Sequence, residues 1–314
     1  MGCLHLEKML AIPEAKVVGV LDLNRELTSA VAYRHRVPPF NRLADLLFEA
    51  DCLVIASSTP SHYTLARAAL EAGVHVLVEK PLTSTADEAL ELSRLADRVG
   101  RVLQVGHIER VRYQALSQWG VLSRVRFIEC HRLASSVGRE AGLDVVSDLM
   151  IHDLDLALNL IGDEPSSVTA IGMEVITPCV DMANVRLEFP SGAVVNASAS
   201  RVSAKSLRKF RVFSAHAYAS LDFVENSASI YTRDPSGEIR YRKEQVESFD
   251  ALRTQAELFL RSVREGIPPI ATGWDGYRAM RCVELVGQRI RERSATLHLS
   301  GAAFDIDDTV WSPA

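Results

Sequence analysis

Residues 51–81 read DCLVIASSTPSHYTLARAALEAGVHVLVEKP, and this stretch decides the fold. Two short apolar runs, at 52–56 and 74–78, show no polar alternation, so each is expected to be a strand buried on both faces. Between them, Ser61 is a candidate cap for a helix that Gly73 ends. A strand, a helix and a second strand in this order predict a βαβ unit of a parallel sheet.

The same pattern continues on both sides of this unit. Strands are expected at 16–21 and 102–105, and helices at 25–36, 43–49 and 85–100, the last opened by a capping box at Thr85. This alternation predicts a Rossmann-type, doubly wound parallel sheet over residues 1–105. The opening Met1-Gly2-Cys3 resembles the last glycine of a G-x-G-x-x-G loop and the start of its helix. We therefore expect the sheet to be truncated at its start, without the strand that precedes such a loop.

After Gly106 the pattern changes to short runs in which apolar and polar residues alternate. Such runs lie at 125–133, 168–175, 183–189, 193–199, 210–213, 220–223 and 229–231. They predict a large, open, mostly antiparallel sheet with one solvated or partner-covered face. Two helices, expected at 252–264 and 275–293, close the chain. Residues 106–314 are therefore expected to form a second α/β domain.

The composition excludes several classes of protein. The 314 residues include 35 Lys and Arg against 40 Asp and Glu, a formal net charge of −5, so a nucleic-acid partner is not expected. No apolar run reaches the roughly 18 residues that cross a bilayer, and no signal peptide is recognisable, so a cytoplasmic protein without a membrane partner is expected. The five cysteines form no C-x-x-C pair, which argues against a disulfide framework or a structural zinc site.

Polar residues stand where the predicted parallel strands end, at the edge where such sheets bind ligands. Asp22 follows the run 16–21, where an acidic residue can bind the ribose hydroxyls of a dinucleotide, or can simply cap the next helix. Lys80 follows the run 74–78 and is fixed by Pro81, so it is expected to point into the crevice. The other strand ends carry Ser58, Thr59 and Pro60 and, further along the chain, His107.

A second group of candidate residues lies at 148–155, where the sequence predicts a helix. Asp148 and His152 are four residues apart and would share one helix face, so that the carboxylate orients the imidazole. A neutral His there would act as a general base near neutral pH. A metal site of His152, Asp153 and Asp155 is the alternative; because Asp153 and Asp155 cannot face the same way on a helix, no metal is expected.

These features, in this order, make the sequence similar to the Gfo/Idh/MocA family of nicotinamide-dependent sugar oxidoreductases over about residues 2–293. The resemblance is carried by the Rossmann pattern, by Glu79-Lys80-Pro81 after a strand, and by the later Asp148-x-x-x-His152. It implies that Lys80 holds and polarises the reacting hydroxyl, that His152 takes its proton, and that Asp148 orients or assists.

The resemblance also implies a cofactor site and a substrate site. The candidate cofactor-binding residues are Gly2, Asp22, Asn24, Arg25, Ser58, Thr59, Pro60, His62, Glu79, Lys80, Pro81 and His107. The candidate substrate-binding residues are Lys80, Glu109, Arg132, Asp148, His152 and Arg201. Arg132, Arg201 or Lys205 could meet a diphosphate, because a guanidinium binds such oxyanions bidentately, but for any one of them a solvated strand face is the favoured interpretation.

Four segments further resemble a branch of the family that acts on the 3-hydroxyl of UDP-N-acetylglucosamine. They are 105–110, 129–133, 144–153 and 199–203. The chain departs from that branch at Val111, Tyr113 and Gln114, where Phe, Asn and Pro are usual.

The function implied by the resemblance is an NAD-dependent dehydrogenase that moves a hydride between a sugar or sugar-nucleotide carbinol and nicotinamide. Asp22 would repel a 2′-phosphate, so NAD is expected rather than NADP, although Arg25 could accept that phosphate. Two alternatives are an NAD-dependent glycosidase of related fold and a non-catalytic sugar- or NAD-binding sensor or scaffold. An open sheet with an uncovered face favours a homodimer or homotetramer.

Overall fold

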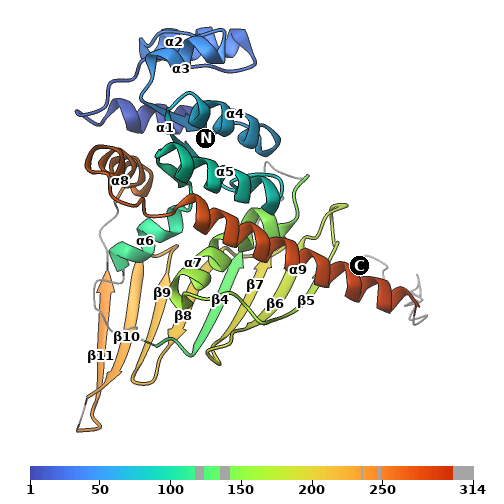
Figure 1. The fold of residues 1–314 in the computed structure, drawn as a ribbon. Coiled ribbons are helices and arrows are strands. Elements are labelled where there is room, and N and C mark those ends of the chain that lie inside the picture. The colour runs from blue at the N-terminus through green and yellow to red at the C-terminus, as the bar shows by residue number, and fades with distance from the viewer. Residues whose placement is uncertain (117–123, 135–141, 235, 246–248, 300–314) are drawn as a thin grey trace, which may run out of the picture.

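The computed structural model of the chain contains two sheets with helices packed between and against them (Figure 1). The structure describes residues 1–116, 124–134, 142–234, 236–245 and 249–299. The first sheet has three parallel strands and the second has eight strands. The predicted fold class, a Rossmann-type parallel sheet followed by an α/β domain with a large sheet, is confirmed. None of the described helices is long and apolar enough to cross a membrane.

The parallel sheet has the order β1-β2-β3, with one helix in each crossover. Its elements are β1 (Cys52–Ile55), α4 (Thr59–Glu71), β2 (His75–Val78), α5 (Ala86–Val99) and β3 (Leu103–Val105). The N-cap of helix α4 is Ser58, three residues before the expected Ser61, because Pro60 is favoured in the first turn of a helix. The predicted capping box at the start of α5 is confirmed, since Thr85 and Glu88 bond reciprocally to each other's backbone.

The run 16–21 is not a strand of this sheet, so that prediction was wrong. It makes a single parallel bridge, between Val20 and Pro39. Val20 donates its N–H to the carbonyl of Pro38 at 3.0 Å and accepts from Phe40 at 2.8 Å. Two consecutive prolines have no N–H to donate, so the pairing cannot extend into a ladder. The helices around this run are α1 (Gly2–Leu10), α2 (Arg25–His35) and α3 (Leu43–Glu49).

The second sheet has the order β11-β10-β9-β8-β4-β7-β6-β5, and only its β4–β7 pair is parallel. Its strands are β4 (Phe127–Leu133), β5 (Ser167–Met173), β6 (Met182–Glu188), β7 (Val194–Ser200), β8 (Leu207–Phe213), β9 (Ala217–Asp222), β10 (Ser227–Arg233) and β11 (Ile239–Gln245). All were predicted from alternation except β11. That edge strand is almost entirely exposed and therefore has no buried apolar face to reveal it.

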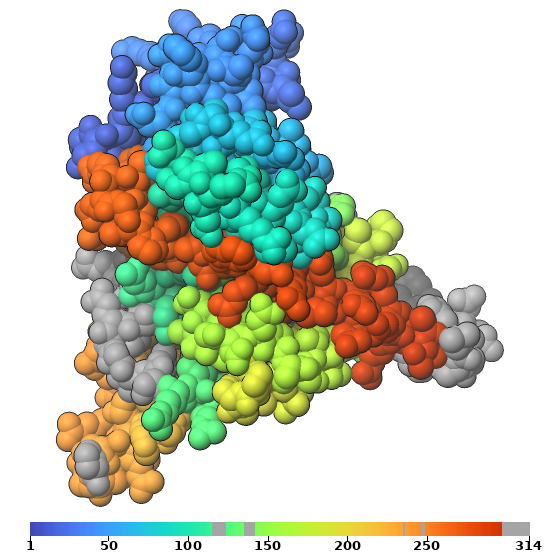
Figure 2. Space-filling model, in the orientation of Figure 1, coloured from blue at the N-terminus to red at the C-terminus, as the bar shows by residue number. Residues whose placement is uncertain are grey.

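Helices cover one face of the second sheet (Figure 1). They are α6 (Ile108–Leu116), the π-helical turn η1 (Val146–Met150), α7 (Ile151–Ile161) and α9 (Gly273–Leu299). Helix α8 (Ala251–Glu265) packs on α1 and α6 instead. Helix α9 lies between α5 and the second sheet, and Figure 2 shows α8 and α9 as an orange-to-red band below the first domain. Gly276 allows this packing, because a Cβ there would lie 2.8 Å from side-chain carbons of Leu82 and Val105. The predicted helices at 252–264 and 275–293 are confirmed.

Candidate active site

Lys80 and Asp148 meet in space although 68 positions separate them in the chain. Strand β2 ends at Val78, and the Lys80–Pro81 peptide bond that follows is cis. The Lys80 ammonium donates to the Asp148 backbone carbonyl at 2.9 Å and to its Oδ1 at 3.0 Å. An ammonium group has three N–H donors. The described residues accept two of them, so one remains for a ligand. Since the Lys80 side chain is 17% exposed, a ligand can reach that donor.

The carboxylate of Asp148 therefore holds Lys80, and no hydrogen bond joins it to His152 among the described residues. The sequence predicted an ordinary helix in which Asp148 and His152 share a face. Instead, Val146–Met150 form a π-helical turn before α7 begins at Ile151. A π turn is wider than an α turn, which changes the angle between side chains four positions apart. The expected orientation of the imidazole by this carboxylate is replaced by a lysine–aspartate pair next to the imidazole.

His152 lies at the start of α7 with a partly exposed side chain. Its buried Nδ1 has no hydrogen-bond partner among the described residues. Burial, followed by the charges of Lys80 and Arg132, holds the pKa of His152 well below its usual range. The ring is therefore neutral near pH 7 and able to accept a proton. The ring of His107 meets it edge-on, with centroids 6.5 Å apart, and burial also lowers the pKa of His107.

Arg132 lies beneath His152 in a fully buried ion-pair network, not on a solvated strand face. Its guanidinium binds both Asp153 carboxylate oxygens at 2.8 Å and Glu109 Oε1 at 3.1 Å. Arg132, Asp153 and Glu109 are each only 3% exposed. Arg201 is 4% exposed, donates to the carbonyl of Leu143 and lies 3.7 Å from Asp181. In this structure, therefore, the two candidate diphosphate-binding arginines bind protein groups.

We expect Arg132→Met to lower the free energy of unfolding by about 3–5 kcal/mol, because it leaves two buried carboxylates without their cation. The matched control is Arg211→Met. Arg211 pairs with Glu129 at 2.7 Å, but those side chains are 36% and 30% exposed. Exposed pairs contribute only about 0–1 kcal/mol. Urea unfolding of both variants measures the difference, and equal losses would contradict the structural role given to Arg132.

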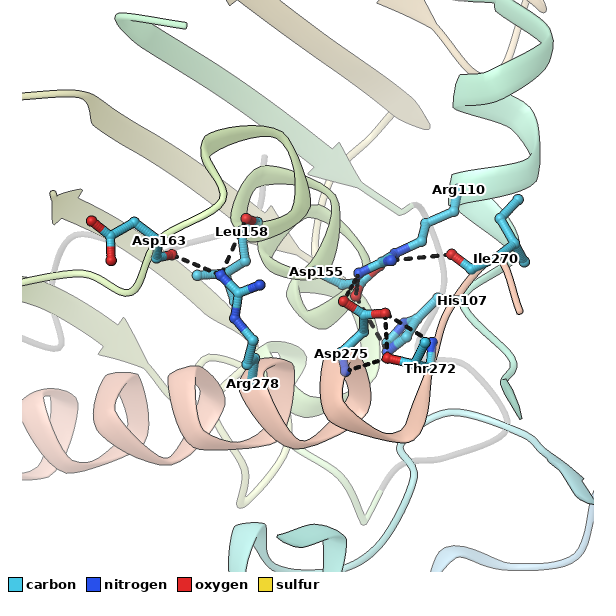
Figure 3. A network of polar contacts seen from close by, with 9 residues as sticks. All are labelled: His107, Arg110, Asp155, Leu158, Asp163, Ile270, Thr272, Asp275 and Arg278. Carbon is cyan, nitrogen blue, oxygen red and sulfur yellow. Dashed lines mark hydrogen bonds and ion pairs between the residues drawn. The ribbon is translucent and has the colours of Figure 1, made fainter. Parts of the chain in front are cut away.

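A second network joins α6, α7 and α9 (Figure 3). Arg110 binds both oxygens of Asp155 at 2.7 Å, Asp275 at 3.1 Å and the carbonyl of Ile270 at 3.1 Å. The Nε2 atom of His107 lies 3.7 Å from Asp155. Asp155 thus binds Arg110 while Asp153 binds Arg132, so each carboxylate of the alternative metal site is paired with an arginine. No group of three or more potential metal ligands exists among the described residues.

The candidate cofactor residues at the strand ends lie around the carboxyl edge of the parallel sheet. The ring of His62 is buried, with its nitrogens 2.9 Å from the Pro81 carbonyl and 3.1 Å from the Ser57 carbonyl. The His62 ring therefore links the segment that follows β1 to the segment that follows β2. Ser58, Thr59 and Pro60 form the start of α4, whose first turn has neither a capping side chain nor an acidic residue. The positive end of the helix dipole favours an anion there; Pro60 has no N–H and the Ser61 N–H donates to the Ser58 carbonyl at 3.0 Å, which leaves the Thr59 N–H for it.

Glu79 has a partner that sequence reasoning missed. Its Oε1 lies 2.6 Å from Nε2 of His5, a residue of α1 that is 3% exposed. A single His in a short helix has no motif that could have indicated this contact. Gly106 approaches Glu79 so closely that a Cβ would lie 3.1 Å from it. The ends of β2 and β3 are thereby held close together beside α1.

The remaining cofactor candidates lie at the starts of α1 and α2. Asp22 accepts a hydrogen bond from the Asn24 N–H at 2.9 Å, and Asn24 caps α2 by accepting from Leu27 at 3.0 Å. Asp22 therefore supports the start of α2, as the alternative interpretation expected. The side chains of Asp22 and Arg25 are also exposed, so a ligand can reach them. A Cβ on Gly2 would meet nothing within 4 Å, so no close approach requires glycine there.

Known proteins resemble this chain over both domains. Residues 1–107 match the oxidoreductase family with an NAD-binding Rossmann fold, and residues 106–219 match the GFO/IDH/MocA C-terminal domain. UDP-N-acetylglucosamine 3-dehydrogenase of Acidithiobacillus ferrooxidans is 38% identical over 287 residues, which cover 89% of this chain and 91% of that protein. Inositol 2-dehydrogenase/D-chiro-inositol 3-dehydrogenase of Halalkalibacterium halodurans is 27% identical over 84% of this chain and 80% of its own length.

Solved structures give the same result. The UDP-N-acetylglucosamine 3-dehydrogenase from Acidithiobacillus ferrooxidans superposes with a TM-score of 0.87 at 36% identity, covering 93% of this chain and 94% of that chain. Levoglucosan dehydrogenase in complex with NADH and levoglucosan has a TM-score of 0.80 at 18% identity, covering 92% and 93% of the two chains. At 18% identity, the similarity to levoglucosan dehydrogenase shows a shared fold alone.

Proposed function

Because the chain belongs to the Gfo/Idh/MocA family of NAD-binding oxidoreductases, we propose that it acts on the 3-hydroxyl of UDP-N-acetylglucosamine. The single observation that supports catalysis is the Lys80–Asp148 pair beside the neutral His152. The relative that is 38% identical supports this choice of substrate. The reaction transfers a hydride between the sugar carbinol and the nicotinamide of NAD.

The described residues fit a bound NAD at the carboxyl edge of the parallel sheet. Helix α4 begins at Thr59, shortly after β1, without a capping side chain, and the positive end of its dipole, with the Thr59 N–H, suits the pyrophosphate. Gly106 keeps this edge free of a side chain that would crowd Glu79, since a Cβ would lie 3.1 Å from it. We propose that Asp22 binds the ribose and favours NAD over NADP, because a carboxylate repels a 2′-phosphate. When bound, NAD⁺ supplies the carbon that accepts the hydride.

The protein's own residues would handle the hydroxyl and its proton. The free N–H of Lys80 donates to the carbinol oxygen and stabilises the negative charge that develops there. His152, neutral because of burial and nearby cations, accepts the hydroxyl proton. Asp148 holds the ammonium in place through contacts of 2.9 and 3.0 Å. In the reducing direction the same residues return the proton to the oxygen.

The test is an assay of NADH formation from NAD⁺ and UDP-N-acetylglucosamine, with an inositol and levoglucosan as comparison substrates. Oxidation of the sugar nucleotide with much higher kcat/KM than either comparison substrate is expected. Release of free sugar without net NADH would instead indicate the glycosidase alternative. Saturable NADH binding without turnover of any of these substrates would indicate the non-catalytic alternative.

We also propose a cytoplasmic homo-oligomer. The five cysteines are all free thiols, as expected in a reducing compartment. On the sheet face opposite the helices, aromatic rings form a row across neighbouring strands, with centroids 4.5 Å apart for Phe213 and Tyr218 and 4.8 Å for Tyr231 and Tyr241. Tyr241 is 54% exposed. Sedimentation is expected to give a dimer or tetramer, and Tyr231→Glu is expected to shift it toward the monomer.

A further inference from the structure

Arg208 differs from the other arginines near the candidate active site. It pairs in register with Arg132 across the β4–β8 ladder. In β8, the residues two and four positions further on, Phe210 and Val212, are buried under the helices. Alternate residues of a strand share a face, so Arg208 lies on the helix-covered face, as Arg132 does. Unlike Arg132, it is exposed, and its guanidinium makes no hydrogen bond or ion pair with the residues that the structure describes.

The charges around Arg208 leave one cation uncompensated. The neighbouring charged groups are Arg112, Arg132, Glu109 and Asp153. Arg132 pairs with Asp153 and shares Glu109 with Arg112, which lies 4.0 Å from that carboxylate. Three guanidinium groups, including Arg208, thus face two carboxylates. Partial burial and the charge of Arg132 lower the pKa of Arg208, so an additional anion would stabilise its charged form.

The backbone also places Arg208 near His152, because Arg208 pairs in register with Arg132, and Arg132 binds Asp153, the residue after His152. The charge of Arg208 contributes to the lowered pKa of His152, together with burial and the charges of Lys80 and Arg132. A group on the sugar that reacts at His152 can therefore lie near this arginine. A neutral sugar brings no charge to match it, whereas a diphosphate presents oxygens that a guanidinium binds bidentately.

We propose that Arg208 binds the diphosphate of the substrate and thereby selects sugar nucleotides over free sugars. This inference rests on the proposed function, since it assigns the substrate's anionic group to one residue of the same site. It also gives a role to an arginine that sequence reasoning did not select. The two arginines that were selected, Arg132 and Arg201, bind protein groups instead.

The experiment compares Arg208→Met with the wild type on UDP-N-acetylglucosamine, on N-acetylglucosamine and in binding of UDP alone. Loss of a charge-assisted contact is expected to lower kcat/KM for the sugar nucleotide and the affinity for UDP by about 10- to 100-fold, mainly through KM. Activity on N-acetylglucosamine, measured at high concentration, is expected to change less than about twofold, since that sugar has no phosphate. Arg208→Lys keeps the charge and is expected to recover part of the UDP affinity.

The matched control is Lys209→Met, the next residue of β8. Lys209 points to the opposite face of the sheet, where it lies 3.8 Å from Asp222. The Lys209→Met variant is expected to leave UDP affinity unchanged. Unchanged UDP affinity in a folded Arg208→Met variant, or no UDP binding by the wild type, would overturn the inference. Wild-type protein that binds UDP through Arg208 but oxidises no sugar nucleotide would overturn the proposed function and leave the inference standing.

Discussion

Replacing Lys80 by Met is expected to lower kcat for the sugar nucleotide by about 10²- to 10³-fold, the usual cost of removing a donor that stabilises a developing oxyanion. The ammonium is held by two contacts to Asp148 and keeps one N–H for the substrate. Met replaces the aliphatic stem of the lysine and lacks only its terminal ammonium, so packing around β2 changes little. Steady-state kinetics with NAD⁺ and UDP-N-acetylglucosamine measure the loss, and NADH binding is expected to be retained.

The control for Lys80 is Lys8→Met, which removes another lysine–aspartate pair. Lys8 lies 2.7 Å from Asp250, with side chains 29% and 41% exposed, and it joins α1 to α8. This variant is expected to keep near wild-type kcat. A folded Lys80→Met protein with the same kcat as the wild type would remove Lys80 from the mechanism.

Replacing His152 by Asn is expected to lower kcat by about 10²- to 10⁴-fold, the range that a positioned general base contributes. Asn is also uncharged and of similar size, so the buried surroundings of the ring gain no new charge. The matched control is His131→Asn. His131 lies on the same β4 strand as Arg132 but on the opposite face of the sheet, and its replacement is expected to leave kcat unchanged.

The pH dependence of the wild type gives an independent check of His152. Oxidation needs the neutral imidazole, so kcat/KM must fall when acid protonates it. Because burial and neighbouring cations lower its pKa, this fall is expected well below the ordinary His value of about 6.5, with little change between that value and neutrality. His152→Asn is expected to lose this acid-side decrease. An acid limb that persists unchanged in the variant would assign the limb to another group.

Local patterns were enough to predict most of the fold. Unbroken apolar runs gave β1 and β2, and a capping box gave the start of α5. The errors came from interactions that a single segment does not contain. The run 16–21 has the composition of a strand, but its neighbour in space is the Pro38-Pro39 pair, which cannot continue a ladder.

The candidate site was predicted in its residues but not in its pairings. A motif identifies Lys80 and His152, but no spacing rule shows that Lys80 meets Asp148 across 68 positions. The π-helical turn also breaks the spacing from which an Asp148–His152 contact was expected. Charge alone did not distinguish Arg132, which is sealed in an ion pair, from Arg208, which is exposed and unpaired among the described residues. The two arginines differ in how deeply the folded protein buries them, and this burial cannot be seen in the sequence.

The continuous helix α9 has a thermodynamic consequence for ligand binding. Its first turns pack on β3 and α5 through Gly273 and bind Arg110 through Asp275, and the rest of the helix packs on α7 and β5. Because α9 packs on both domains, the unfolding of either domain would expose a buried side of this helix and weaken its packing on the other domain. Ligand that stabilises one folded domain must therefore raise the melting temperature of both together. NADH, although bound at the parallel sheet, should for this reason protect the distant eight-stranded sheet from heat, in a single cooperative transition.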